Sequence, residues 1–227
     1  MRAFGNHILL PAAVVAFVSF LDTGAPASEK SLMLAAGGAV WLLFANSVNY
    51  GGMMLWHERG LLRHAVISPW LLLAAAALVP IGLFAVHLSL IHLALLAGAF
   101  PRRGAGSETL VAGGIAAASG LGAGILAARL TELRPNFALM LPKLLLVSLV
   151  LTPVFYPLSA LGGLKDPWCL ANPLCVATEL GRAGNSFQAD ALPRYAIAIA
   201  CASSGAILCW GLLTLRLRSI SFADEHV

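Results

Sequence analysis

Apolar residues occur along this chain in long segments, separated by short polar ones. A helix needs roughly 20 apolar residues to cross a bilayer. The pattern therefore predicts an all-α, polytopic membrane protein with six transmembrane helices in a single domain, residues 1–227. The predicted spans are about 8–21, 31–49, 66–99, 109–130, 137–156 and 191–215.

The first predicted span, residues 8–21, fits two interpretations. Arg2, the apolar run and the small residues Ala25-Pro26-Ala27 resemble a secretory signal peptide with its cleavage site. The same run also fits a short span that stays in the protein. We favour the retained span, because signal cleavage is uncommon before a polytopic bundle, and removal of residues 1–27 stays the alternative.

The most polar segment on the predicted inner side is Tyr50 to His64. Methionine, leucine and Trp56 give it apolar contacts, while histidine, arginine and Glu58 give it a charged side. This pattern predicts a short amphipathic element at the membrane surface. An interfacial connector and a docking helix for a soluble partner both fit, and spacing alone favours the connector.

The segment Leu151 to Arg182 is neither a clean helix nor a polar loop. It contains four prolines, which break helices, and aromatic residues of the kind found at membrane interfaces. Irregular backbone at membrane depth is tolerated only where protein or a water-filled cavity surrounds it. We therefore predict an outer re-entrant segment that is a candidate lining for a transport path.

Small and ionisable residues inside the spans suggest packing rather than chemistry. Gly120 and Gly124 form a small-xxx-small pair that predicts tight helix contact. His87 and His92 are five residues apart, about 140° around a helix, so a straight helix would not present both to one metal. We expect them to be neutral and hydrogen-bonded between helices.

Composition and charge restrict the class further. Hydrophobic residues make up 59% and charged residues 11%, against about 25% charged in soluble domains. The net charge of +4 comes with no basic run of the kind that binds nucleic acid. Eight Arg and Lys fall on the predicted inner side and six on the outer side, which favours cytoplasmic termini.

The four cysteines indicate no metal site, since none has zinc-ligand spacing. Cys201 and Cys209 lie within an apolar span. Cys169 and Cys175 lie in the outer segment, where an oxidising compartment would permit a disulfide. We expect two reduced structural cysteines there, with the disulfide as the alternative.

Sequence motifs for catalysis are missing. The chain contains no phosphate-binding GxxxxGK[ST] loop, no GxSxG and no HExxH. Paired intramembrane carboxylates, which proton coupling would require, are also missing. We expect no catalytic residue, cofactor or metal, and a transport body whose energy comes from elsewhere.

Several short motifs occur together in this chain: Thr152-Pro153, Tyr156-Pro157, Asn172-Pro173-Leu174, Glu179, Arg182, Gly60 to His64 with Ser68-Pro69, and the tail Ile220 to Glu225. Together they resemble the permeases of ABC-2 transporters that export capsular polysaccharide, O-antigen and related polymers. Thr131-Glu132 departs from the Arg-Asp often found after the fourth span of that family.

The resemblance implies a permease subunit that moves a lipid-linked polysaccharide across the bacterial inner membrane. It implies a homodimer, contact with membrane lipid, and a separate ABC ATPase subunit that hydrolyses ATP. The inner element would then be the ATPase-coupling element, through Trp56, His57, Glu58, Arg59, Leu61, Leu62 and Arg63. The path would be lined by Phe155, Tyr156 and Trp168, whose alternative is interfacial anchoring, and the re-entrant segment fixed by Pro157, Asn172, Pro173, Glu179 and Arg182.

Two other functions stay open. A membrane-embedded enzyme or assembly factor acting on lipid-linked sugars would need polar side chains at one depth, for which Asn46, Asn49, His87 and His92 are the candidates. An ABC-2 permease for a drug or small lipid would show the same overall pattern. The exact substrate is not readable from the sequence.

Overall fold

The computed structural model describes residues 27–58, 68–96, 107–156, 169, 171–185 and 192–224. Within these ranges the chain is helical and contains no strand. The elements are α2 (Ala27–Asn46), the π-helix η1 (Ser47–Gly52), α3 (Met54–His57), α5 (Pro69–Leu96), α6 (Ser107–Leu133), α7 (Phe137–Leu151), α9 (Pro173–Gly184) and α10 (Arg194–Asp224).

The described residues contain four helices that are long and apolar enough to cross a membrane. These spans are Leu32–His57, Trp70–Leu93, Ser107–Leu133 and Arg194–Arg216. They coincide with the predicted second, third, fourth and sixth spans. The first predicted span, 8–21, lies outside the described residues. The length and apolar composition of these four helices are therefore compatible with a membrane protein.

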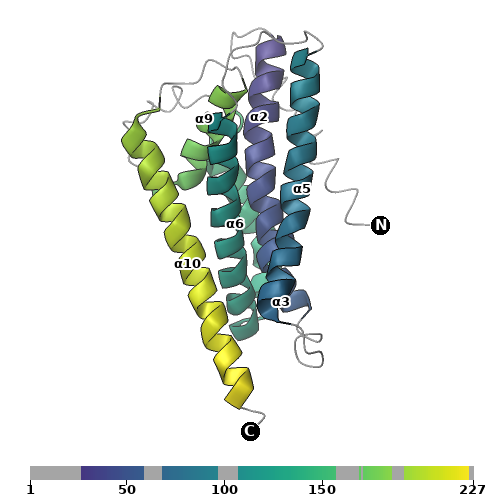
Figure 1. Ribbon diagram of the computed structural model, residues 1–227, viewed down its shortest axis with the longest axis vertical. Coiled ribbons are helices and arrows are strands. Elements are labelled where there is room, and N and C mark those ends of the chain that lie inside the picture. The colour runs from purple at the N-terminus through teal and green to yellow at the C-terminus, as the bar shows by residue number, and fades with distance from the viewer. Residues whose placement is uncertain are drawn as a thin grey trace.

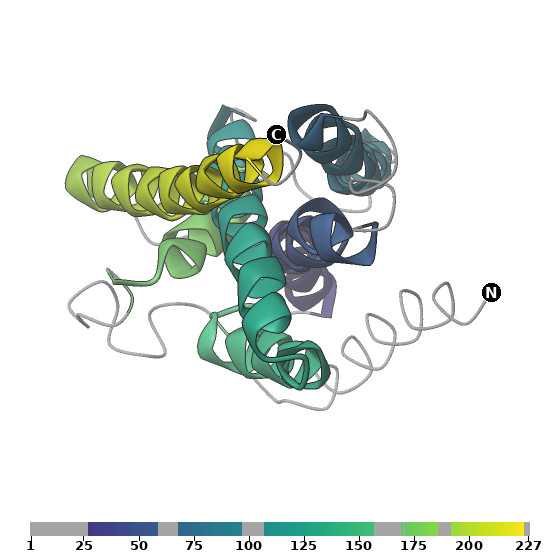
Figure 2. The same ribbon diagram turned by 90° about the horizontal axis from the view of Figure 1, so that it is seen from below.

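The long helices run in alternating directions around α6 (Figures 1 and 2). In Figure 1, α2, α6 and α10 descend while α5 ascends. We call the lower end, where α3 lies and α10 terminates, the α3 end, and the upper end the α9 end. The central helix α6 contacts α2, η1, α9 and α10, so it organises the bundle.

Glycines of α6 bring three helices to backbone contact. A Cβ added at Gly124 would lie 2.6 Å from the Val48 carbonyl oxygen and 2.8 Å from Gly52 Cα. A Cβ at Gly122, which faces another direction, would lie 2.6 Å from the backbone of Ile207 in α10. The predicted tight contact of the glycine pair is confirmed, and Gly122 adds a second close contact.

The amphipathic element does not begin at Tyr50 as predicted. Residues 47–57 continue the second span through η1 and α3. Gly51, Gly52 and Leu55 are buried, because the two glycines let this stretch lie directly against α6. This stretch reaches the surface at the exposed Asn49 and His57, while Tyr50, Met54, Trp56 and the following Glu58 are half-buried.

The fifth predicted span, 137–156, is also shorter than expected. Helix α7 has 15 residues and ends at Leu151, after which Thr152 adopts an extended conformation. Proline disfavours the helical conformation of the residue before it, and Pro153 follows Thr152 directly. Trp41 of α2 donates a 3.3 Å hydrogen bond to Ser148, which ties α7 to the bundle.

Candidate functional site

The short helix α9 is the most completely buried element of the described chain. Of its 12 residues, only Ala183 is more than minimally exposed. Asn172 caps its first turn by accepting a 3.0 Å hydrogen bond from the Leu174 amide, and Pro173 occupies the first helical position. Both residue types are favoured at these positions because the first amides of a helix have no intrahelical acceptor.

The course of α9 places its first residue part-way along the bundle. Its last turn lies beside Thr109, in the first turn of α6, since a Cβ added at Gly184 would collide with Thr109 Oγ1. Its first turn lies beside the end of α7, where the Cys175 thiol is 4.0 Å from the Leu151 carbonyl oxygen. The helix therefore rises from the depth at which α7 stops toward the α9 end.

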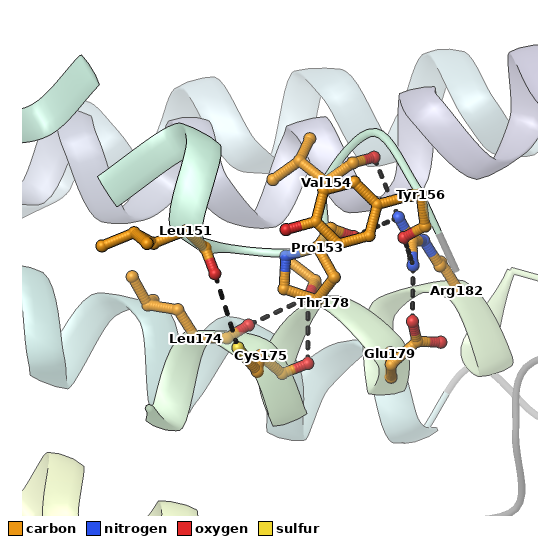
Figure 3. Close-up of polar contacts among 9 residues, drawn as sticks. All are labelled: Leu151, Pro153, Val154, Tyr156, Leu174, Cys175, Thr178, Glu179 and Arg182. Carbon is orange, nitrogen blue, oxygen red and sulfur yellow. Dashed lines mark hydrogen bonds and ion pairs between the residues drawn. The ribbon is translucent and has the colours of Figure 1, made fainter. Parts of the chain in front are cut away.

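Glu179 and Arg182 form an ion pair on α9 (Figure 3). The distance from Arg182 Nη1 to Glu179 Oε1 is 2.5 Å, and the side chains are 0% and 1% exposed. The two charges are therefore paired with each other and shielded from solvent. Removing two charges from water costs several kcal/mol per ion, which their attraction offsets only when further hydrogen bonds complete the site.

Those further hydrogen bonds go to the turn that follows α7. Arg182 Nη1 donates to the Tyr156 carbonyl oxygen at 3.1 Å, and Nη2 donates to that of Val154 at 2.8 Å and to that of Pro153. The turn is not helical, so its carbonyls have no intrahelical partner. One guanidinium therefore satisfies three backbone acceptors and joins α7 to α9 (Figure 3).

Close approach to α2 depends on one glycine. A Cβ added at Gly37 would lie 3.3 Å from both Nε and Nη2 of Arg182. Nε is buried and has no hydrogen-bond acceptor among the described residues. Gly37 thus lets the guanidinium lie between α2, α9 and the turn after α7.

The polar network extends beyond the residues that sequence reasoning selected. Asn185 Nδ2 donates to Thr109 Oγ1 at 3.1 Å and to the Gly181 carbonyl oxygen at 2.6 Å. Thr178, Arg182 and Asn185 are spaced i, i+4, i+7, which is one helical face. From this spacing the sequence could have shown that Thr178 and Asn185 share a helical face with Arg182. Nothing in the sequence predicts that Arg182 lies against Gly37 or that Asn185 binds Thr109.

The candidate path residues lie on the surface of this network. Phe155 and Tyr156 are half-buried, and the Tyr156 hydroxyl donates to the Val150 carbonyl oxygen at 3.0 Å. The rings remain partly exposed, and the hydroxyl oxygen of Tyr156 can still accept a hydrogen bond. Trp168 and Pro157 lie outside the described residues.

The candidate coupling residues that the structure describes lie at the α3 end. His57 Nδ1 donates to the Met53 carbonyl oxygen at 2.9 Å, since a carbonyl can only accept. The rings of Trp56 and His57 meet edge to face, with centroids 5.2 Å apart. Arg59, Leu61, Leu62 and Arg63 lie outside the described residues.

The intramembrane histidines do not join helices as predicted. His87 and His92 each donate from Nδ1 to a carbonyl of their own helix, those of Leu83 at 2.7 Å and Leu88 at 2.8 Å. They lie toward the α9 end of α5, whereas Asn46 ends α2 near the α3 end. The two histidines and Asn46 therefore lie at different depths, whereas the enzyme alternative needs its polar side chains at one depth.

The two outer cysteines are buried and in contact with each other. No disulfide joins the cysteines at these described positions, as expected for reduced structural residues. Cys201 and Cys209 are exposed on α10. No group of three or more His, Cys, Asp or Glu side chains among the described residues is placed to hold a metal ion.

Comparison with known proteins identifies no relative. No protein-family model matches this chain, and no curated protein matches its sequence. The function is therefore inferred from the residues and their geometry.

Proposed function

We propose that this protein is the membrane-spanning permease subunit of an ATP-driven exporter of the ABC-2 type, which moves a lipid-linked polysaccharide across the bacterial inner membrane. Two copies enclose the path, and a separate ABC ATPase subunit hydrolyses the ATP. The termini lie in the cytoplasm, so the α3 end faces the ATPase and the α9 end faces outward.

The observation that carries the proposal is the network around Arg182. The most specific part of the resemblance is spread over 31 positions of the sequence, from Thr152 to Arg182. Thr152 to Tyr156 form the turn, Asn172-Pro173 begin α9, and Glu179 with Arg182 connects the two. This part of the resemblance therefore belongs to one structural unit, which supports a shared architecture over a chance match of short motifs.

The course of α9 supports an outer re-entrant segment. Helix α9 is too short to cross a membrane, since 12 residues extend about 18 Å. It is buried on all sides and rises from mid-bundle to the α9 end. Phe155 and Tyr156 lie at this segment, and aromatic faces there suit stacking on sugar rings.

The residues at the α3 end support a coupling surface. It continues the second span and is not a separate amphipathic helix. His57 ends α3 and Glu58 follows it, one short turn after η1, whose glycines contact α6. A partner that pushes on this surface would therefore act on the central helix. Such a displacement shifts the permease between states only if the ATP-bound partner binds one state more tightly.

Co-purification tests the proposal. The tagged full-length chain, extracted in detergent from its native host, is expected to retain an ATPase with a phosphate-binding loop. The double variant His57→Asp/Glu58→Lys is expected to lose it, because both side chains lie at the coupling surface. Arg194→Glu is the matched control, since this exposed charge begins α10 at the opposite end of the bundle.

Three results would separate the possibilities. Retention in the wild type and in Arg194→Glu, with loss in the double variant, supports the permease and its coupling surface. Retention in all three chains places the coupling surface elsewhere. An ATPase missing from the wild-type sample overturns the transporter proposal.

A further inference from the structure

Lys143 occupies an unusual position on α7. The helix buries a single stripe, Leu141, Leu145 and Leu149, against the bundle. Lys143 lies two residues from Leu145, about 200° around the helix, and therefore projects away from the bundle. Its side chain is exposed on a surface that is otherwise apolar, next to Met140 and Val147.

The depth of Lys143 sets where its ammonium group can lie. It is six residues after Phe137, the first residue of α7, or about 9 Å along the helix. A lysine at this depth extends its stem along the apolar surface and brings its charge toward the membrane interface. The nearer interface lies on the side of the α6–α7 turn, which carries Arg134.

Arg134 supplies a second exposed cation at this corner. The nearby Arg129 is already bound to Glu132 at 3.2 Å, which leaves that carboxylate engaged. No acidic side chain among the described residues pairs with Arg134 or Lys143 in an ion pair of 4.0 Å or less. Two exposed positive charges, nine positions apart along the α6–α7 turn and α7, thus have no ion pair within the described chain.

We propose that the corner formed by Arg134 and Lys143 binds the headgroup of an anionic phospholipid. The phosphate lies between the two cations at the interface. The acyl chains lie along the exposed apolar surface of α7, which includes Leu139, Met140, Leu144 and Val147. Basic residues on the cytoplasmic side of transmembrane helices are known to attract anionic lipids.

Charge complementarity selects this occupant. A zwitterionic lipid would bring a positive group to a site that already holds two cations, and a polypeptide partner would have to present an acid at the membrane surface. An anionic lipid supplies the negative charge and the apolar chains together. The inference needs only a membrane-embedded bundle, and it stands whether or not the chain pairs with an ATPase.

Lipid binding can be measured on the intact protein by native mass spectrometry. The full-length chain is titrated with phosphatidylglycerol and, separately, with phosphatidylcholine of the same chain length. We expect the wild type to prefer phosphatidylglycerol. Lys143→Gln and Arg134→Gln should each weaken its binding about fivefold, and the double variant roughly 25- to 30-fold.

Arg194→Gln is the matched control, because it removes one exposed cation from the opposite end of the bundle. Its affinity for phosphatidylglycerol should stay at the wild-type value. Inorganic phosphate should not displace the lipid, since the apolar chains contribute to binding.

Equal affinity of the wild type for the two lipids would overturn the proposal. So would an unchanged phosphatidylglycerol affinity in the double variant. Both variants keep their fold in this test, as checked by an unchanged melting temperature in phosphatidylcholine, because neither side chain is buried.

Discussion

The guanidinium of Arg182 lies against the backbone of α2 at Gly37. A Cβ at Gly37 would be 3.3 Å from two of its nitrogens and 3.5 Å from the Val154 carbonyl oxygen that accepts from it. This contact is tighter than ordinary van der Waals packing. It places a buried charged group at the point where α2, α9 and the turn after α7 meet.

Gly37→Ala is therefore expected to lower stability by about 1–3 kcal/mol, as overpacking of a well-filled interior does. Gly38→Ala is the matched control, because a Cβ there meets nothing within 4 Å. Helical Gly→Ala changes without a clash stabilise by roughly 0.5–1 kcal/mol. Unfolding in an SDS titration compares the two variants, and equal effects would show that the guanidinium contact is unimportant.

Arg182→Met should be among the most destabilising single changes in this chain. It leaves Glu179 buried without its cation and removes the donor from three carbonyls, for a loss of about 3–5 kcal/mol. Adding Glu179→Leu should restore part of that loss, because the uncompensated charge is then gone. The double-mutant cycle measures the coupling, and strictly additive losses would contradict a functional ion pair.

Gly124→Ala is expected to disrupt the contact between α6 and η1. The new Cβ would meet the Val48 carbonyl oxygen and Gly52 Cα, which are backbone atoms that cannot move aside without shifting a helix. Gly114→Ala, on the same helix, meets nothing within 4 Å and serves as its control. Melting temperatures in detergent should fall for the first variant and stay or rise for the second.

Tyr156 offers a test of the path that separates the ring from the hydroxyl. Its hydroxyl proton is already donated to the Val150 carbonyl oxygen, so under the permease proposal we assign the contact with a sugar to the ring face. Under the permease proposal, Tyr156→Phe should retain most export, whereas Tyr156→Ala should lose most of it. Export of labelled polymer from cells is the measurement, with surface expression of the variants as control. Equal loss in both variants would assign the hydroxyl the more important role.

Much of the architecture could be predicted from the residues alone. Composition predicts membrane embedding, since 11% charged residues is well below the roughly 25% of soluble domains. Helix positions follow from the length of the apolar segments. The Gly120–Gly124 contact was also predictable, because small residues at that spacing have one main use in apolar helices.

Element ends were less predictable, because they depend on neighbours. Tyr50 to His64 was predicted to be an amphipathic surface element, yet α6 supplies a glycine surface against which Gly51, Gly52 and Leu55 are buried. The histidines of α5 were expected between helices, but each finds its acceptor one turn back in its own helix.

The sequence by itself determined the lipid environment of the chain, its helical class and the approximate positions of its spans. These properties depend on the identities of consecutive residues. Only the tertiary structure decided that Glu179 and Arg182 are a buried pair, that the pair binds a turn 26 to 29 positions earlier, and that Gly37 makes room for it. Charges spaced i, i+3 on a helix form the same pair on a solvated surface or in an interior. Which of the two occurs depends on the helices that pack around them.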